Sequence, residues 1–233
     1  MKKNVEDFLA FKNGEIRMPA HLRPSKVVKG VLYKSSLMET ITRAPIYVTQ
    51  AMWVSIILLF VYLAFAKMGL SFIQVAAQFI AGIFTWTFIE YMIHRFVYHT
   101  ETNNDAFINL QFTMHTIHHQ HPKDSDRLAM PPVPGLILGS IFLGIFYLIM
   151  GRYAFAFFPG FLAGYLMYIT LHYYQHIVKS PRYKPWQRLW VHHKGHHYAN
   201  PYAAFGVSTR LWDWVFGTML PKSKKESAIP EEA

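Results

Sequence analysis

The chain has 233 residues, of which 52% are hydrophobic, 17% aromatic and only 15% charged, whereas about 25% of the residues in soluble domains are charged. It contains no cysteine, which excludes disulfides, thiolate metal sites and thiol chemistry. The formal net charge of +10 suggests nucleic acid as one partner, but the positions of the basic residues along the chain favour a membrane surface.

Four long apolar segments predict membrane-spanning helices. At 1.5 Å per residue, segments of about 18–24 residues match a ~30 Å hydrocarbon core. Glu90 is the one charged residue among them and lies near the end of its segment. We therefore expect an all-α integral membrane protein with two helical hairpins; the alternative is four buried helices of a soluble protein, which would need a far larger covering mass. The segments are 46–66, 70–93, 133–150 and 153–171.

The basic residues predict which side of the membrane each connection faces. Nine Lys and Arg lie in 1–45, three in 95–132 and nine in 177–233, whereas the two hairpin turns carry one each. The positive-inside rule places both termini and the central loop in the cytoplasm, against anionic headgroups. We expect an N-terminal cytosolic or interfacial segment (1–45), a membrane domain with a cytosolic helical cap (46–221) and a polar, disordered tail (222–233).

Twelve of the thirteen histidines fall in four clusters, each at or beyond the predicted cytoplasmic end of a span. Imidazoles at i, i+3 and i+4 of a helix share one face, so each H-x-x-H-H motif can offer three nitrogens to one side. A spacing of five, as in His94 and His99, leaves about 140° between side chains of an ideal helix, so we expect the helix to end or unwind there. The clusters contain ten candidate ligands: His94, His99, His115, His118, His119, His172, His176, His193, His196 and His197.

The clusters repeat along the chain. His94 and His172 are 78 positions apart, and the same shift converts the first H-x-x-H-H motif into the second. Either a duplication or a shared geometric need explains this regularity. Ten ligands predict two metal ions with about five histidines each, and imidazole suits Zn, Cu, Fe and Ni. Ten cationic imidazoles would repel each other, so the neutral, ligating form is expected.

Other polar residues near the clusters are candidates for supporting roles. Glu90, His121 and His192 are candidates for orienting the ligands, and helix-end solvation is the alternative for Glu90. His21 stands alone and is expected at the surface. The chain has no G-x-S-x-G elbow and no H-E-x-x-H motif, which disfavours hydrolysis and leaves oxygen activation by iron.

Three stretches resemble the fatty acid hydroxylase and sterol desaturase superfamily, and most of all the fatty acid 2-hydroxylases. TWTFIEYMIHRFVYH (85–99) resembles their first histidine motif, and MHTIHHQHPKDSDRLAMPP (114–132) resembles the second, with its D-R-L-x-M-P-P sequence. HHKGHHYANPYAAFGVSTRLWDWVFGT (192–218) is similar to the last motif and its tail. The likeness covers roughly 80–218. Ile169 departs from the acidic residue that is common after the tyrosine in these relatives.

This resemblance implies a four-helix membrane bundle with a cytosolic cap and a dimetal centre that is itself the catalytic group. It implies two non-haem iron ions, with zinc possible in purified protein, and hydroxylation by O2 at carbon 2 of an acyl chain, free or in a ceramide-like lipid. Relatives often carry a fused cytochrome-b-type domain; about 45 residues precede the first span, so we expect a separate cytochrome-b-type or ferredoxin-type donor. Bacterial inner membrane and endoplasmic reticulum both fit.

Three residues are candidates for the substrate path: Tyr168, Met130 and Trp212. The aromatic segment 205–217 is either an interfacial lid over that path or a packing helix. Two rival functions stay open: a sterol or carotenoid hydroxylase or desaturase of the same superfamily, and a membrane metal carrier. A carrier would place polar ligands at mid-bilayer, whereas every cluster here lies near the end of a span. No nucleic acid partner is expected.

Overall fold

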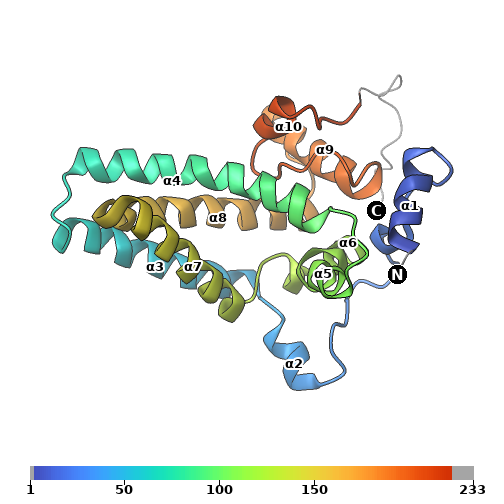
Figure 1. Ribbon diagram of the computed structural model, residues 1–233, viewed down its shortest axis with the longest axis horizontal. Coiled ribbons are helices and arrows are strands. Elements are labelled where there is room, and N and C mark those ends of the chain that lie inside the picture. The colour runs from blue at the N-terminus through green and yellow to red at the C-terminus, as the bar shows by residue number, and fades with distance from the viewer. Residues whose placement is uncertain (1–2, 222–233) are drawn as a thin grey trace.

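The computed structural model describes residues 3–221, all of whose regular structure is helical. The predicted tail, 222–233, lies outside the described residues. Two antiparallel helical hairpins lie side by side and form an elongated bundle (Figure 1), and a compact group of shorter helices covers one end of it. The four long helices are α3 (Ile46–Ala66), α4 (Phe72–Ile93), α7 (Pro132–Met150) and α8 (Ala154–Ile177).

Three stretches of the described chain are long and apolar enough to cross a membrane, namely Ile46–Ala66, Phe72–Tyr98 and Ser125–Ile177. The third contains both α7 and α8, which the turn η5 (Gly151–Tyr153) separates. Gly151 has φ +56°, a conformation that glycine adopts without steric cost. At the other hairpin, Ser71 caps α4 and exchanges hydrogen bonds with Gln74.

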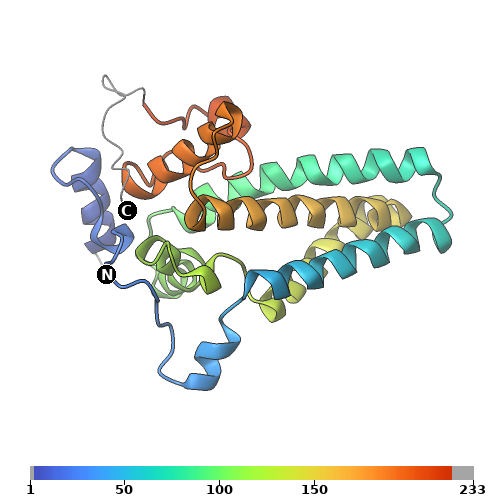
Figure 2. The same ribbon diagram turned by 180° about the vertical axis from the view of Figure 1, so that it is seen from behind.

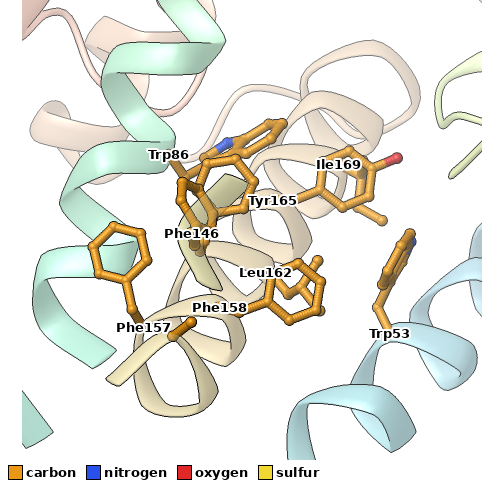
Figure 3. Close-up of a cluster of buried hydrophobic side chains, with 10 residues drawn as sticks. Trp53, Trp86, Phe146, Phe157, Phe158, Leu162, Tyr165 and Ile169 are labelled. Atoms are coloured by element: carbon orange, nitrogen blue, oxygen red, sulfur yellow. The ribbon is translucent and has the colours of Figure 1, made fainter. Parts of the chain in front are cut away.

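The bundle packs around α8, which contacts α3, α4 and α7. Gly82 of α4 and Gly160 of α8 let these two helices approach closely, because a Cβ on Gly160 would overlap the backbone of Phe79. Between this contact and the cap the core is aromatic. The rings of Trp86 and Tyr165 meet edge to face there, with their centroids 5.0 Å apart (Figure 3). Small residues at the crossing and rings beside it are typical of helix packing in membranes.

The cap is built from short helices that follow α4 and α8, together with an N-terminal arm that lies beside them at the same end of the bundle (Figure 2). Partly buried ion pairs tie the arm to the loop after α6: Arg43 donates to Asp124, and Arg127 to Glu39. The cap and arm helices are α1 (Lys3–Lys12), η1 (Ala20–Leu22), α2 (Ser36–Ile41), η2 (His94–Tyr98), α5 (Asp105–Gln111), η3 (Phe112–Thr116), α6 (Ile117–Gln120), η4 (Ser125–Arg127), α9 (Lys184–Tyr198) and α10 (Leu211–Val215).

Candidate metal centre

The ten candidate histidines come together in two groups of five where the cap meets the bundle. Within each group one nitrogen of every histidine lies within 4.8 Å of the others. Nine of the rings are buried, and His176 is half-buried. We call the groups site A and site B: site A contains His94, His99, His115, His119 and His196, and site B contains His118, His172, His176, His193 and His197.

Each H-x-x-H-H motif is divided between the two sites, which corrects the expectation that its three nitrogens share one side. His115 and His119, at i and i+4, belong to site A, whereas His118 belongs to site B. The second motif is divided the other way, because His193 and His197 join site B. Three and four helical steps differ by one residue, or about 100° around the helix, which is enough to point neighbouring rings at different centres.

A π-helical turn explains the spacing of five between His94 and His99. Residues His94–Tyr98 form η2, a π-helix that continues α4. Because a π-turn closes i to i+5, both rings face site A, with their centroids 5.1 Å apart. The equivalent pair in site B, His172 and His176, lies in regular α-helix with a spacing of four. The helix therefore widens over its last turn and ends there, with His99 as its C-terminal cap, which agrees with the expected end or unwinding at this pair.

Backbone carbonyls orient three of the imidazoles. The Nδ1–H groups of His94, His172 and His196 donate to the carbonyls of Phe205, Leu128 and Ala203 respectively. A carbonyl can only accept, so the Nδ1 atom of each ring carries the proton. In a neutral ring the Nε2 atom then presents its lone pair to the centre of the site, as a ligand must.

The Nε2 atoms face each other closely in both sites. In site A, the Nε2 of His115 lies 3.0 Å from those of His94 and His119. In site B, the Nε2 of His176 lies 2.7 Å from that of His193 and 3.2 Å from that of His172. Converging lone pairs of this kind have a cation as their natural partner, so the donor set fits one metal ion in each site.

Burial keeps these imidazoles neutral. Burial, followed by the nearby imidazoles, lowers the pKa of the cap histidines well below its usual range; these are His99, His115, His118, His119, His193, His196 and His197. The neutral form is the one that binds metal. The Nδ1 atoms of His99, His118 and His119 are buried without a hydrogen-bond partner.

Two buried carboxylates hold the loop that orients His94 and His196. Asp213 accepts from the backbone N–H groups of Phe205 and Gly206 at 2.9 and 2.7 Å. Glu90 accepts from the N–H groups of Val207 and Ser208 at 2.7 and 2.9 Å. Ala204, in the same loop, has φ +60°, which is uncommon for a residue with a side chain and turns the carbonyls on either side of it toward the histidines.

None of the three residues expected to orient ligands hydrogen-bonds directly to one of the ten candidate histidines in the described structure. The carboxylate of Glu90 holds the 207–208 backbone, one step removed from any ring. His192 hydrogen-bonds to Asp213 at 2.9 Å and so supports the same loop. The Nδ1 atom of His121 lies 2.7 Å from the carbonyl oxygen of Val27, so His121 packs against the N-terminal arm. Asp213 was not singled out from the sequence, although the W-D pair of the tail contains it.

An apolar cavity of about 350 Å³ extends from the histidines into the bundle. The end of the cavity nearest the cap is lined by rings of both sites: His94 and His115 from site A, and His118 and His172 from site B. Trp53 and Phe142 line the part of the cavity that lies between the long helices. A chain lying in this cavity would pass beside sites A and B with one end and extend between the long helices with the other.

Two of the three residues predicted for the substrate path line this cavity, namely Tyr168 and Met130. Trp212 does not, which corrects its assignment: its ring packs against Phe84 and Phe88 of α4, and its Nε1–H donates to Thr87 at 3.0 Å. The sequence interpretation of 205–217 as a packing segment is therefore the better description at Trp212.

Comparison with known proteins gives a consistent result. A sequence profile described as fatty acid hydroxylase matches residues 79–218. "Fatty acid 2-hydroxylase" of Macaca fascicularis is 35% identical over 211 residues, and the match covers 82% of this chain but 57% of the relative. "Dihydroceramide fatty acyl 2-hydroxylase FAH2" of Arabidopsis thaliana is 31% identical, and the match covers 80% of this chain and 78% of the relative.

The fold is also found in a solved structure. The chain superposes on "Full length scs7p (only hydroxylase domain visible)" with a TM-score of 0.78 and 32% sequence identity, covering 89% of this chain and 79% of the other. The chain spans a little over half the length of the animal relatives that it matches.

Proposed function

The chain belongs to the fatty acid hydroxylase family, and from this premise we propose that it is an O2-dependent fatty acid 2-hydroxylase of a membrane. The observation that carries the proposal is the apolar cavity whose end nearest the cap is lined by histidines of both sites. The substrate is an acyl chain, either of a free fatty acid or of a ceramide-like lipid. The names of the relatives, which include fatty acid and dihydroceramide hydroxylases, support both.

We propose that sites A and B each hold one iron ion, which when bound supplies O2 activation. The overall reaction converts an acyl C–H bond, O2, two electrons and two protons into C–OH and water. The electrons come from a separate cytochrome-b-type or ferredoxin-type protein. The histidines of the chain hold the ions, and the carbonyls of Ala203, Phe205 and Leu128 fix the direction of their rings.

The residues of the cavity position the acyl chain and exclude water. The apolar side chains between α3, α4, α7 and α8 accept the hydrocarbon tail, because they replace its contact with bilayer lipid by close packing. Tyr165 accepts a hydrogen bond from the backbone N–H of Met130 at 3.3 Å and thereby fixes the loop at the end of the cavity nearest the cap. A carbon near the head group then lies beside the histidines, which favours attack at carbon 2.

The proposed orientation in the membrane has α3, α4, α7 and α8 as four passes, with both termini and the two sites on the cytoplasmic side. The excess of Lys and Arg outside the hairpin turns supports it. Bacterial inner membrane and endoplasmic reticulum both satisfy this arrangement.

Product analysis tests the function. Protein reconstituted with iron, a chemical reductant, labelled oxygen and a lipid extract should yield acyl chains that carry one labelled oxygen at carbon 2, as read by mass spectrometry. His193→Ala should abolish the product, whereas Gln187→Ala, on the exposed face of the same helix α9, should retain it. Oxygen located near the methyl end, or on a sterol or carotenoid alone, would refute the proposal.

A further inference from the structure

The N-terminal arm presents an exposed surface that is both apolar and basic. It lies in residues 26–41, which we call the arm segment. Lys26, Lys29 and Lys34 are exposed, and the one acidic residue, Glu39, is paired inward with Arg43 and Arg127. Seven large apolar side chains of the segment are between 41% and 68% exposed: Val27, Val28, Val31, Tyr33, Leu37, Met38 and Ile41.

The protein holds this surface outward through its backbone. The N–H of Gly30 donates to Asp124 at 3.0 Å, and Arg43 donates to the carbonyl of Gly30 at 3.0 Å. The N–H groups of Leu32 and Tyr33 both donate to Glu39, at 2.9 and 3.1 Å. A segment that is fixed by specific hydrogen bonds and ion pairs and is yet rich in exposed apolar side chains calls for a partner that covers them.

The position of the arm segment identifies the partner. Along the long axis of the molecule, α2 lies at the same level as α10, and the two helices flank the bundle on opposite sides (Figures 1 and 2). Trp214 of α10 is 74% exposed. Apolar side chains at one level on both sides of a membrane bundle, with lysines beside them, match the headgroup layer of an anionic leaflet.

The arm segment also reaches the substrate cavity. Leu32 of the segment and Thr42, which follows it, line the cavity together with Arg127. We infer that residues 26–41 dock into the headgroup layer of an anionic leaflet and so place the opening of the cavity against the lipid. This inference rests on the proposed membrane position of the bundle, and it adds a route by which the acyl substrate enters laterally from the bilayer.

Site-directed spin labelling tests the inference directly, because the chain has no cysteine and any introduced cysteine is unique. Leu37→Cys places the label on the exposed face of α2 in the full protein, reconstituted in nanodiscs of phosphatidylcholine and phosphatidylglycerol. Its accessibility to oxygen, relative to a water-soluble nickel chelate, should report a depth of about 5–10 Å below the headgroup boundary.

Two control positions separate this inference from the proposed membrane placement. Ser55→Cys lies on the exposed face of α3, in the middle of a candidate span, and should report lipid. Lys12→Cys, on α1 at the far end of the cap, should report water. If the label at position 37 matches the one at position 12 while position 55 reports lipid, the inference is overturned and the placement stands. If position 55 also reports water, the placement itself fails.

The basic residues give a second, independent measurement. Replacing Lys26, Lys29 and Lys34 together by Gln should make the label at position 37 shallower in anionic nanodiscs and leave its depth in pure phosphatidylcholine nearly unchanged. An equal depth with and without the lysines in anionic nanodiscs would contradict the role of charge. A label shielded from both oxygen and the nickel chelate would instead show that protein, such as a second copy of the chain, covers the segment.

Discussion

Individual residues set the direction of the histidines from outside the two sites. The rings of His94 and His196 donate to the backbone carbonyls of the 203–205 loop, and Asp213 holds that loop through the N–H groups of Phe205 and Gly206. Asp213 is fully buried and also contacts His192. One carboxylate thus fixes the geometry of two rings that it does not touch.

Asp213→Ala should therefore destabilise the protein and weaken metal retention in site A. Each buried N–H group that loses its acceptor costs about 1–3 kcal/mol in the free energy of unfolding. Thermal unfolding in detergent should show a lower Tm, and elemental analysis should show less bound metal than in the parent protein. Asp105→Ala, at an exposed position of α5, should leave the metal content intact. Unchanged metal in Asp213→Ala would contradict the role assigned to this carboxylate.

Acid should weaken the arm through Glu39. Burial opposes the ionisation of this carboxyl, but the N–H groups of Tyr33 and Leu32 and the guanidinium of Arg127 outweigh it and lower its pKa from 4.5 to about 2. A lowered folded-state pKa stabilises the fold above the ordinary pKa, and this contribution is lost as the pH falls from 4.5 toward 2. The Tm of the parent protein should fall more steeply across that range than the Tm of Glu39→Gln. Parallel curves would show that Glu39 contributes nothing to acid sensitivity.

The sequence identified the ten histidines because imidazole spacing is visible in one dimension, whereas their supports are not. No local sequence pattern around Asp213 indicates that it holds the backbone of Phe205 and Gly206, because this contact forms only when the loop folds back. The pairing of Arg127 with Glu39 joins residues 88 positions apart, and no local pattern encodes it. For the same reason the sequence placed Trp212 on the substrate path, although in the structure it packs on the outer side of α4.

At the scale of elements, the contact between α4 and α8 determines how the sites form. His94 follows α4 directly, and His172 and His176 lie on the last turns of α8. Both helices extend from the bundle into the cap without interruption, so their packing at Gly82, Gly160 and Gly164 fixes the relative position of rings from both sites. Gly160 approaches the backbone of Phe79, and Gly164 approaches the side chain of Trp86, so both glycines serve this packing.

Gly160→Ala should disrupt this contact. The added Cβ would meet the backbone of Phe79, which cannot rotate away, and overpacking of this kind costs about 1–3 kcal/mol. Gly144→Ala is the matched control on α7, because a Cβ there meets nothing within 4 Å. Differential scanning fluorimetry should show a lower Tm for Gly160→Ala and an equal or higher Tm for Gly144→Ala. Equal Tm values for both variants would contradict the close packing of α4 on α8.

The π-turn of η2 is a feature that the spacing of the histidines does not predict. A spacing of five predicts that an ideal helix cannot continue with both rings on one face, so the helix is expected to end or unwind there. In the structure the helix widens into a π-turn at His94–Tyr98 and then ends, with His99 as its C-terminal cap. Periodicity alone does not reveal the π-turn, because the wider turn extends over only five residues.

Across the whole molecule, the two sites are related by the repeat seen in the sequence. A shift of 78 positions takes His94, His115 and His119 of site A to His172, His193 and His197 of site B, and the longer His94–His99 spacing accounts for the one-residue mismatch at His99 and His176. His118 and His196 are also 78 apart, but each belongs to the site of the other half. Each half of the chain therefore completes a histidine group of the other half, so neither group of five can form from one half alone.

This exchange predicts that metal loss follows the sites and not the order of the chain. The pair His118→Ala and His172→Ala lies wholly in site B although 54 positions separate the two residues. The pair His115→Ala and His118→Ala lies within one motif but affects both sites. Elemental analysis should show that the first double variant keeps about one of the two metal equivalents, as His118→Ala alone does, whereas the second loses both. In the second variant each site keeps four of its five imidazoles, whose lone pairs are then open to protons. The loss of metal from this variant should therefore be greater in mild acid. Equal metal loss in the two double variants would show that the histidines act as a single cluster, and the division into sites A and B would then be wrong.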